Sequence, residues 1–254
     1  MKKIFLFIAI SAIIFYFLKK TTQNITKKEI TVGMMDGYPP YMDISANGVP
    51  EGFDVSITTA LAKELGTTIT IKDLGNLSTL FLALENETID AVMSGLDITK
   101  ERAKNYEIVY YYGEKNDRAY IVTLKNAISE DNFDQHSWKI AIEPGSSNEF
   151  VLQKKENVQL IPLTNYTDMM VHLKNKKIDG FLLDVSQIQR FRELNDDSIS
   201  FIEITVPEES MTNGLGITFK KGNGRTKEKI QTAVTKLIEN GTIAELARTW
   251  ELQK

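Results

Sequence analysis

The chain contains no cysteine and only two histidines among its 254 residues. Without cysteine, the sequence excludes disulfide bonds, a thiolate nucleophile, a Cys-ligated metal and a lipid-modified cysteine anchor. The histidines, His136 and His172, do not form the closely spaced pair that is typical of zinc sites. We therefore expect neither a metal nor any other cofactor.

An excess of positive charge is also lacking. The formal net charge is −4, with 34 acidic and 30 basic side chains, whereas nucleic-acid-binding domains normally carry a basic stripe. The composition, with 42% hydrophobic and 25% charged residues, is that of an ordinary globular protein with one large domain or two modest ones. A nucleic-acid partner is therefore not expected.

Long hydrophobic runs are absent, with one exception at the N-terminus. Residues 4–18 are apolar and have a pair of lysines on each side, which is the pattern of an export signal. At about 15 residues the run is short for a membrane-spanning helix, which needs about 20. No clear small-residue cleavage site follows, so residues 1–20 are either a cleaved signal peptide or a membrane anchor, and the polar residues 21–28 form a tether. We expect a periplasmic or otherwise extracytoplasmic protein.

From residue 29 onward, β-branched runs typical of strands alternate with helical patterns. Asp54 is predicted to cap the first helix, which ends at Leu65. The resulting β-α-β-α-β order indicates a mainly parallel sheet covered by helices. This first series comprises predicted strands at residues 29–33, 68–72 and 91–93 and predicted helices at residues 54–65 and 77–84.

A second series of the same kind follows. Residues 80–86 resemble residues 169–175, and each segment leads into Ile-Asp and a small residue. Chance is an alternative explanation, because many helix-turn-strand units use such residues. The second series comprises predicted strands at residues 120–122, 138–143, 158–163, 178–184 and 202–206 and predicted helices from residue 148 and at residues 166–173.

The two series predict an α/β protein of two lobes, each a mainly parallel sheet flanked by helices, with a ligand cleft between them; a single sheet is the alternative. The C-terminal part adds a strand at residues 215–219 and amphipathic helices at residues 226–239 and around Trp250. If these helices return to the first lobe, the chain crosses twice and forms a hinge. We assign residues 29–113 and 212–254 to lobe 1 and residues 114–211 to lobe 2.

Residues 89–102 contain the sequence's most informative turn. An apolar strand breaks at Ser94-Gly95, and a helix restarts at Thr99, a good N-cap, with Arg102 in its first turn. Exposed backbone donors beside a fixed cation are suited to an anion. A routine strand-to-helix connection with a solvated arginine is the alternative.

Polar side chains follow several predicted strands, and ligands of bilobed α/β proteins bind at such strand ends. Arg102 with the Ser146-Ser147 turn would hold a carboxylate, and Asp184 with Asp97 would accept an ammonium. Tyr38 could supply an apolar wall or a cation–π face. These groups suit a free amino acid. As alternatives, Asp184 and the two serines could merely cap helices, and Tyr38 could be a packing residue.

Four segments resemble family 3 extracellular solute-binding proteins, the polar amino-acid receptors of ABC importers. The resemblance covers the chain from residue 29 in order, and its tail, including Trp250, is most similar to arginine-binding members. The segments are Gly37-Tyr-Pro-Pro-Tyr41, Gly52-Phe-Asp54, residues 89–102 and Gly145-Ser-Ser147.

The resemblance implies roles for individual residues. Arg102 would clamp the α-carboxylate and Ser147 would share it from the second lobe, while Asp184 would accept the α-ammonium. Tyr38 would stack on the ligand side chain, and the backbone of Ser94 and Gly95 would line the site.

Two positions depart from the family. Leu77 stands where many members have an aromatic residue. One of the two side chains that would flank the ligand side chain is therefore not aromatic. Asp97 replaces the usual serine or threonine, and two carboxylates close together demand a second positive charge or a raised pKa. Asp36 could add to this acidity, as could Glu143. We therefore expect a cationic ligand such as arginine, lysine or ornithine, unless Asp97 turns away and caps the following helix.

The sequence thus favours a monomeric receptor that closes around a free, basic amino acid by a hinge motion and presents it to a membrane permease of an ABC importer. A second hypothesis is an enzyme, a prephenate or arogenate dehydratase-like lyase on the same fold, with a raised-pKa aspartate as general acid. A third is a ligand-sensing domain tethered to the membrane.

Overall fold

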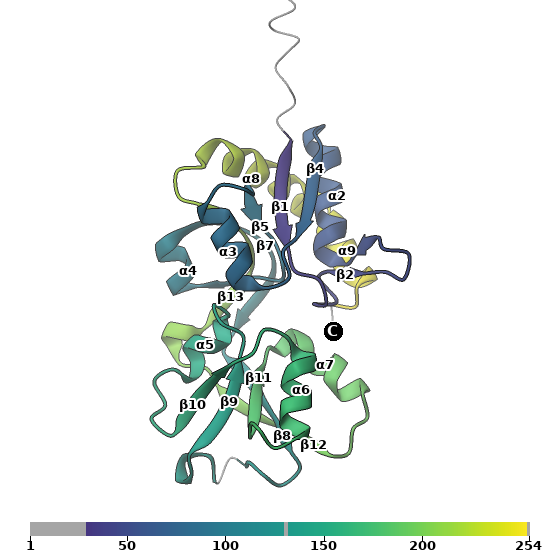
Figure 1. The fold of residues 1–254 in the computed structure, drawn as a ribbon. Helices are drawn as coiled ribbons and strands as arrows, with labels where there is room; N and C mark the ends of the chain where they lie inside the picture. The colour runs from purple at the N-terminus through teal and green to yellow at the C-terminus, as the bar shows by residue number, and fades with distance from the viewer. Residues whose placement is uncertain (1–28, 130–131, 253–254) are drawn as a thin grey trace, which may run out of the picture.

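The computed structural model describes residues 29–129 and 132–252, which contain two large sheets, one above the other in Figure 1, and a small two-stranded sheet of β2 (Asp43–Ile44) and β3 (Pro50–Glu51). The upper sheet holds the first predicted series together with the C-terminal strand. Its strands, in spatial order, are β4 (Ile69–Asp73), β1 (Ile30–Met34), β5 (Ala91–Val92), β13 (Thr212–Lys220) and β6 (Asp97–Thr99), with β7 (Tyr106–Asn116) also paired to β13.

The lower sheet holds the second series. Its strands, in spatial order, are β10 (Val158–Pro162), β9 (Trp138–Ile142), β11 (Gly180–Leu183), β8 (Arg118–Leu124) and β12 (Ile199–Thr205). The two sheets with their helices are the two lobes, which confirms the two-lobed α/β fold. We call them lobe 1 (upper) and lobe 2 (lower).

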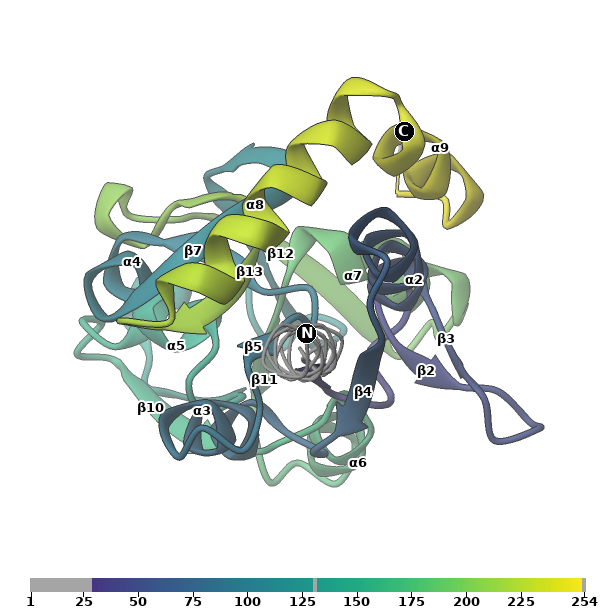
Figure 2. The same cartoon turned by 90° about the horizontal axis from the view of Figure 1, so that it is seen from above.

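Helices cover both faces of each sheet. In Figure 2, α3 lies on one side of the upper sheet, and α2, α8 and α9 lie together on the other. The apolar residues Ile230, Val234 and Leu237 of α8 are buried against lobe 1 as their helical spacing predicts, but Ile238, which the same pattern places inward, is exposed. The helices are α2 (Phe53–Leu65), α3 (Leu77–Glu85), α4 (Lys100–Asn105), α8 (Gly224–Glu239) and α9 (Thr242–Thr249) in lobe 1, and α5 (Ser147–Leu152), α6 (Tyr166–Lys174) and α7 (Val185–Glu193) in lobe 2.

Both sheets are mixed rather than mainly parallel. The strands linked by helices pair in parallel, β1 with β4 and β5, and β9 with β10 and β11. The strands that carry the chain between lobes pair antiparallel, β13 with β5, β6 and β7, and β8 with β11 and β12. The β-α alternation predicts only the first kind of pairing, because strands without a crossover helix are free to run in either direction.

The chain passes between the lobes twice. It leaves lobe 1 where β7 gives way to β8, and it returns between β12 and β13. The helices α8 and α9 then pack on lobe 1, as expected. The boundaries at residues 113/114 and 211/212 stay a prediction.

The similarity between the two series extends to identical hydrogen bonds. In lobe 1 the Asp90 carboxylate accepts the Thr31 N–H at 2.9 Å, and the Asp90 N–H donates to the Thr31 carbonyl. In lobe 2 the Asp179 carboxylate accepts the Lys139 N–H at 2.8 Å, and the Asp179 N–H donates to the Lys139 carbonyl. Each Ile-Asp pair therefore fastens the strand that follows it to an earlier strand, β5 to β1 in lobe 1 and β11 to β9 in lobe 2.

The helices before these strands are capped alike. Asn76 caps α3 by accepting the Thr79 N–H, and Asn165 caps α6 by accepting the Asp168 N–H. Leu77 directly follows Asn76 and Tyr166 directly follows Asn165, so Leu77 and Tyr166 occupy equivalent positions in the two lobes. The internal repeat is thus structural and not a chance resemblance.

Asp54 does not cap α2, contrary to the prediction. The helix begins at Phe53 with Gly52 at the N-cap position, and the Asp54 side chain is completely buried. Its carboxylate accepts the Gly95 N–H at 2.6 Å and the Tyr111 hydroxyl at 2.7 Å, which ties α2 to the Ser94-Gly95 turn and to β7. Burial raises the pKa of Asp54 to about 7.

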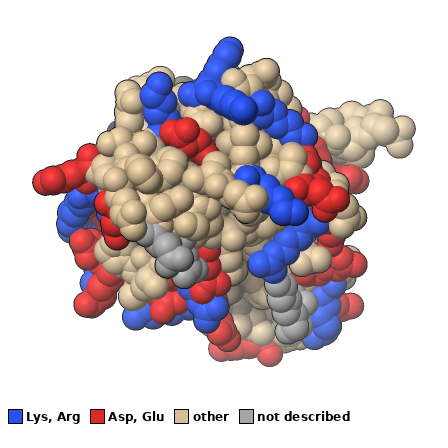
Figure 3. All heavy atoms as spheres, turned by 90° about the horizontal axis from the view of Figure 1, so that it is seen from below, with Lys and Arg blue, Asp and Glu red and all other residues tan. Residues whose placement is uncertain are grey.

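The predicted export signal and tether lie outside the described residues. Within residues 29–129 and 132–252, no helix combines the length and the apolarity that a membrane span requires. On the face of lobe 2 that Figure 3 shows from below, Lys and Arg side chains are interspersed with Asp and Glu.

Replacing Asp54 with alanine should lower the free energy of unfolding by about 2–4 kcal/mol, because two buried donors would lose their acceptor. Urea unfolding followed by circular dichroism measures this. As a control, Asp134→Ala removes a carboxylate whose side chain is 77% exposed and should change the free energy by less than about 0.5 kcal/mol. Similar values for the two variants would contradict the structural role of Asp54.

Candidate functional site

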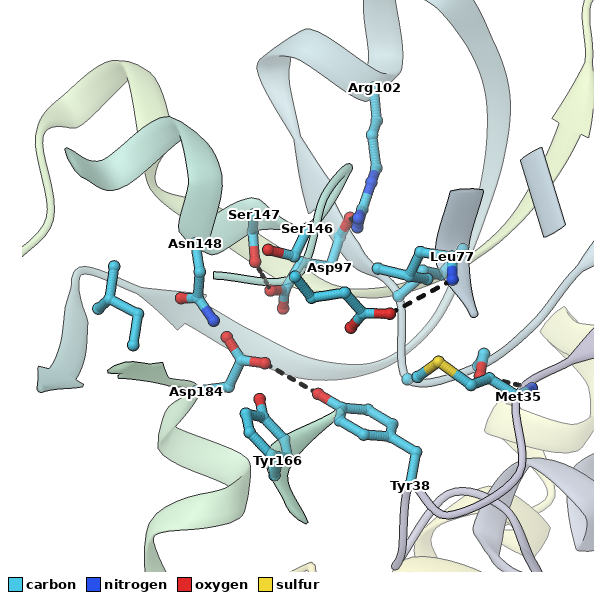
Figure 4. A pocket seen from close by; sticks show the side chains of 15 residues that line it. Met35, Tyr38, Leu77, Asp97, Arg102, Ser146, Ser147, Asn148, Tyr166 and Asp184 are labelled. Atoms are coloured by element: carbon cyan, nitrogen blue, oxygen red, sulfur yellow. Dashed lines mark hydrogen bonds between the residues drawn. The ribbon is translucent and has the colours of Figure 1, made fainter. Parts of the chain in front are cut away.

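A pocket lies between the lobes, lined by residues that follow β1, β9 and β11 (Figure 4). Lobe 1 contributes Tyr38 after β1, Asp97 from β6 and Arg102 from α4, and lobe 2 contributes Ser147 and Asp184.

The structure brings together all the predicted site residues except Asp36. The residues that line the pocket as predicted are Tyr38, Leu77, Ser94, Gly95, Asp97, Arg102, Ser146, Ser147 and Asp184.

Asp36 lines an adjoining pocket instead. Its carboxylate accepts the N–H of its own neighbour Gly37 at 2.7 Å, and this bond turns the side chain back toward its loop. The adjoining pocket shares Met35, Tyr38, Glu143 and Tyr166 with the central one, so the two are neighbours.

Arg102 is buried in the pocket wall with its cation incompletely paired. Thr99 caps α4 by accepting the Arg102 N–H at 3.1 Å, as the sequence predicts, and this sets the direction of the side chain. Nη1 donates to the Asp97 carbonyl at 2.8 Å and Nη2 to the Gly145 carbonyl at 2.9 Å, while Nε is buried and makes no hydrogen bond. Among the described residues no carboxylate forms an ion pair with this guanidinium. A buried charge in this state is stabilised by an anion.

Three carboxyl groups line the same pocket. Asp97 accepts the Ser147 hydroxyl at 2.5 Å, and Asp184 accepts the Tyr38 hydroxyl at 2.8 Å. Glu143, the first residue after β9, accepts the Leu77 N–H at 3.3 Å. When all three are ionised, three negative charges face the single positive charge of Arg102, which leaves a net charge of −2.

Burial raises the pKa of each of these carboxyl groups. The pKa of Asp97 rises to about 7 through burial and the nearby charge of Asp184. The pKa of Glu143 also rises to about 7, mainly through burial, and that of Asp184 is raised by burial as well. The pocket therefore favours either protons or a cation beside its carboxylates.

The helix-cap alternatives are not what the structure shows. Asp184 and Ser146 occupy the N-cap positions of α7 and α5, but neither side chain makes a capping hydrogen bond. Asp97 does not cap α4, because Thr99 does. The Asp97 and Asp184 carboxylates both bond across the interlobe space instead (Figure 4).

Gly95 is required by its surroundings. Its φ is +58°, and a Cβ at this position would collide with the Tyr41 ring. Tyr41 is accordingly buried beneath the turn and outside the central pocket. Because the Gly95 N–H donates to Asp54, this group is not free to bind a ligand.

The sequence prediction missed Tyr166 and Asn148 and left Glu143 as a secondary candidate. The pocket includes all three. Tyr166 begins α6, its ring lies 6.2 Å from that of Tyr38, and it packs against the cores of both lobes. The internal repeat was the available signal, because it relates Tyr166 to the predicted site residue Leu77.

The model of the bacterial extracellular solute-binding proteins, family 3, matches residues 30–253. The putative ABC transporter arginine-binding protein 2 of Escherichia coli is 27% identical over 214 residues, which cover 84% of this chain and 86% of that protein. More distant relatives include the L-cystine-binding protein TcyJ of Escherichia coli and the glutamine-binding protein GlnH of Bacillus subtilis, at 24% and 22% identity.

Solved structures agree with the fold. A Salmonella typhimurium periplasmic binding protein described for high arginine specificity superposes with a TM-score of 0.77 at 24% identity, over 87% of this chain and 98% of that one. An ancestral arginine-binding protein bound to arginine has a TM-score of 0.75 at 25% identity, over 87% of this chain and 97% of that one.

The ligand-free protein should open as the pH rises through about 7. A carboxyl group whose pKa is raised in the closed pocket binds more protons there than in an open, solvated cleft. Closure is therefore favoured below the raised pKa, about 7 for Asp97 and Glu143, and this preference is lost as the pH rises through it. Small-angle X-ray scattering should give a larger radius of gyration at pH 8 than at pH 5.5.

The double variant Asp97→Asn, Glu143→Gln should show a smaller dependence on pH, whereas Asp134→Asn, at an exposed site of lobe 2, should behave like the unmodified protein. An unmodified protein with the same radius at both pH values would contradict this expectation.

Proposed function

Since the chain belongs to the bacterial extracellular solute-binding proteins, family 3, we propose that it captures a free amino acid and presents it to the membrane permease of an ABC importer. The observation that carries the proposal is the buried Arg102 guanidinium, whose Nε has no partner in a pocket between two lobes. An α-carboxylate is the anion that such a group is suited to bind.

The remaining polar groups complete a site for an amino acid. Ser147, from lobe 2, lines the same pocket as Arg102 and would share the carboxylate. Asp184 would accept the α-ammonium, since it lies in the same pocket and carries a negative charge when ionised. Tyr38 holds Asp184 through its hydroxyl and offers its ring to the ligand side chain.

We further propose that the ligand is a basic amino acid, in first place arginine. With all three carboxyl groups ionised, the pocket has a net charge of −2, which a neutral zwitterion does not balance, whereas a ligand with one positive charge reduces it. Relatives named for arginine support this assignment, although others are named for cystine and glutamine.

Capture is proposed to proceed by hinge closure. The two strand crossings are the available hinge, and the lobes contact each other through hydrogen bonds that rotation would break. These include Arg102 Nη2 to the Gly145 carbonyl at 2.9 Å and Gln187 Nε2 to the Pro39 carbonyl at 3.0 Å. The assignment of residues 29–113 and 212–254 to one lobe and residues 114–211 to the other belongs to this proposal.

The family is extracellular, so the protein acts outside the cytoplasm. We propose that residues 1–20 direct its export, either as a cleaved signal peptide or as a retained anchor. Intact mass measurement of the protein from its native membrane and extracytoplasmic fractions distinguishes the two.

The lyase hypothesis is not supported. The family is defined by solute binding, and the curated relatives are binding proteins. The raised pKa values of the pocket carboxyl groups are accounted for by their burial and mutual repulsion.

Calorimetry with a panel of amino acids should show preferential binding of arginine, lysine or ornithine. Mass spectrometry of the ligand released by denaturing freshly purified protein provides an independent measurement. Preferential binding of glutamine or glutamate would contradict the basic specificity while leaving the receptor function intact.

Arg102→Ala should weaken amino-acid binding by more than about 100-fold, because the ligand carboxylate would be buried without a cation. Its thermal unfolding should show that the chain still folds. Arg225→Ala, an exposed arginine of α8, is the matched control and should bind normally. Micromolar affinity retained by Arg102→Ala would remove this residue from the site.

A further inference from the structure

We infer that Glu143 recognises the cationic end of the ligand's side chain and so determines which amino acids the site accepts. The inference rests on the proposed amino-acid receptor function and adds to it the residue that selects a long, positively charged side chain.

The first observation is the position of Glu143 between two pockets. Asp97 and Asp184 line the central pocket and also the pockets on its hinge side, near Asn116 and Thr212. Glu143 lines the central pocket and the adjoining pocket on the other side. The central pocket therefore has an end with Asp97 and Asp184 and an opposite end with Glu143.

This arrangement determines the orientation of the ligand in the central pocket. With its carboxylate at Arg102 and its ammonium at Asp184, the ligand must extend its side chain toward the end where Glu143 lies. The walls along this path are apolar or aromatic, formed by Met35, Leu77 and the rings of Tyr38 and Tyr166. Such walls suit the methylene groups of a long side chain.

The second observation is that Glu143 has little to bind within the protein. Among the described residues its carboxylate receives one hydrogen bond, the 3.3 Å bond from the Leu77 N–H that Figure 4 marks with a dashed line ending at Leu77. No lysine or arginine forms an ion pair with it in that part of the chain. Burial raises its pKa to about 7, so a cation beside it would stabilise its ionised form.

The adjoining pocket lies on the solvent side of Glu143. It is lined by the exposed residues Gly37, Thr164 and Asn165 in addition to those it shares with the central pocket. A guanidinium or an ammonium can therefore sit at Glu143 without complete burial, which lowers the cost of removing it from water.

A different role for the same contact must be distinguished. Glu143 belongs to lobe 2 and Leu77 begins α3 of lobe 1, so their hydrogen bond could act only as a latch that holds the lobes together. A latch would strengthen the binding of every ligand equally. A residue that recognises the side chain would change the ratio of affinities for charged and neutral ligands.

The experiment compares the unmodified protein with Glu143→Gln by calorimetry against L-arginine, L-lysine and L-glutamine. We expect the substitution to weaken arginine and lysine binding by about 10–100-fold, the range for a hydrogen bond between charged groups. The affinity for glutamine should stay within about 3-fold. The arginine-to-glutamine ratio should therefore fall by at least about 3-fold.

Two further variants serve as controls. Glu245→Gln makes the same change on the exposed surface of α9 and should leave all affinities unaltered. Glu143→Asp keeps the charge with a shorter reach and should retain the preference for cations, which tests the inference even if Glu143→Gln does not fold.

The outcomes separate the two proposals. If the unmodified protein binds arginine but Glu143→Gln weakens arginine and glutamine equally, Glu143 is only a latch and this inference fails while the receptor function stands. A Glu143→Asp variant without preference for cations would overturn it as well. If the unmodified protein binds no amino acid, the proposed function fails and this inference fails with it.

Discussion

A positive charge buried between two lobes is the constraint on which the rest of the structure depends. Arg102 reaches the pocket because Thr99 starts α4 at the right residue, and its Nη atoms are held by carbonyls of both lobes. Without a ligand, the closed pocket leaves Arg102 Nε without a hydrogen-bond partner and holds three carboxyl groups close to one another. Closure and ligand binding are therefore coupled by charge.

Much of this could be predicted from residue patterns. The strand-turn-helix pattern of residues 89–102 locates Arg102 correctly because capping and buried-strand signals are local. The two lobes follow from the repeated series, whose Ile-Asp pairs make equivalent bonds in both lobes. Polar residues after parallel strands meet at one sheet edge, so Asp184 and Ser147 could be placed in the cleft from the sequence pattern.

What could not be predicted depends on contacts between distant segments. Asp54 has the sequence pattern of a helix cap, but its partners Gly95 and Tyr111 are supplied by other elements. The strand β7 has no helix after it to mark its end, and its pairing with β13 joins residues more than 90 positions apart. Asp36 has the expected residue type in the expected loop, but its carboxylate bonds to the Gly37 N–H and lines the adjoining pocket.

Because of the internal repeat, the two walls of the pocket are built from equivalent strands and helices. This bears on how the pocket distinguishes the two ends of an asymmetric ligand. Loops that follow equivalent strands face each other, so identical residues in both would offer a ligand the same chemistry at either end. The lobes differ at related positions: Met35 follows β1 where Glu143 follows β9, and Leu77 begins α3 where Tyr166 begins α6. The two ends of a ligand can be distinguished because the two copies of the repeat carry different residues where they face each other.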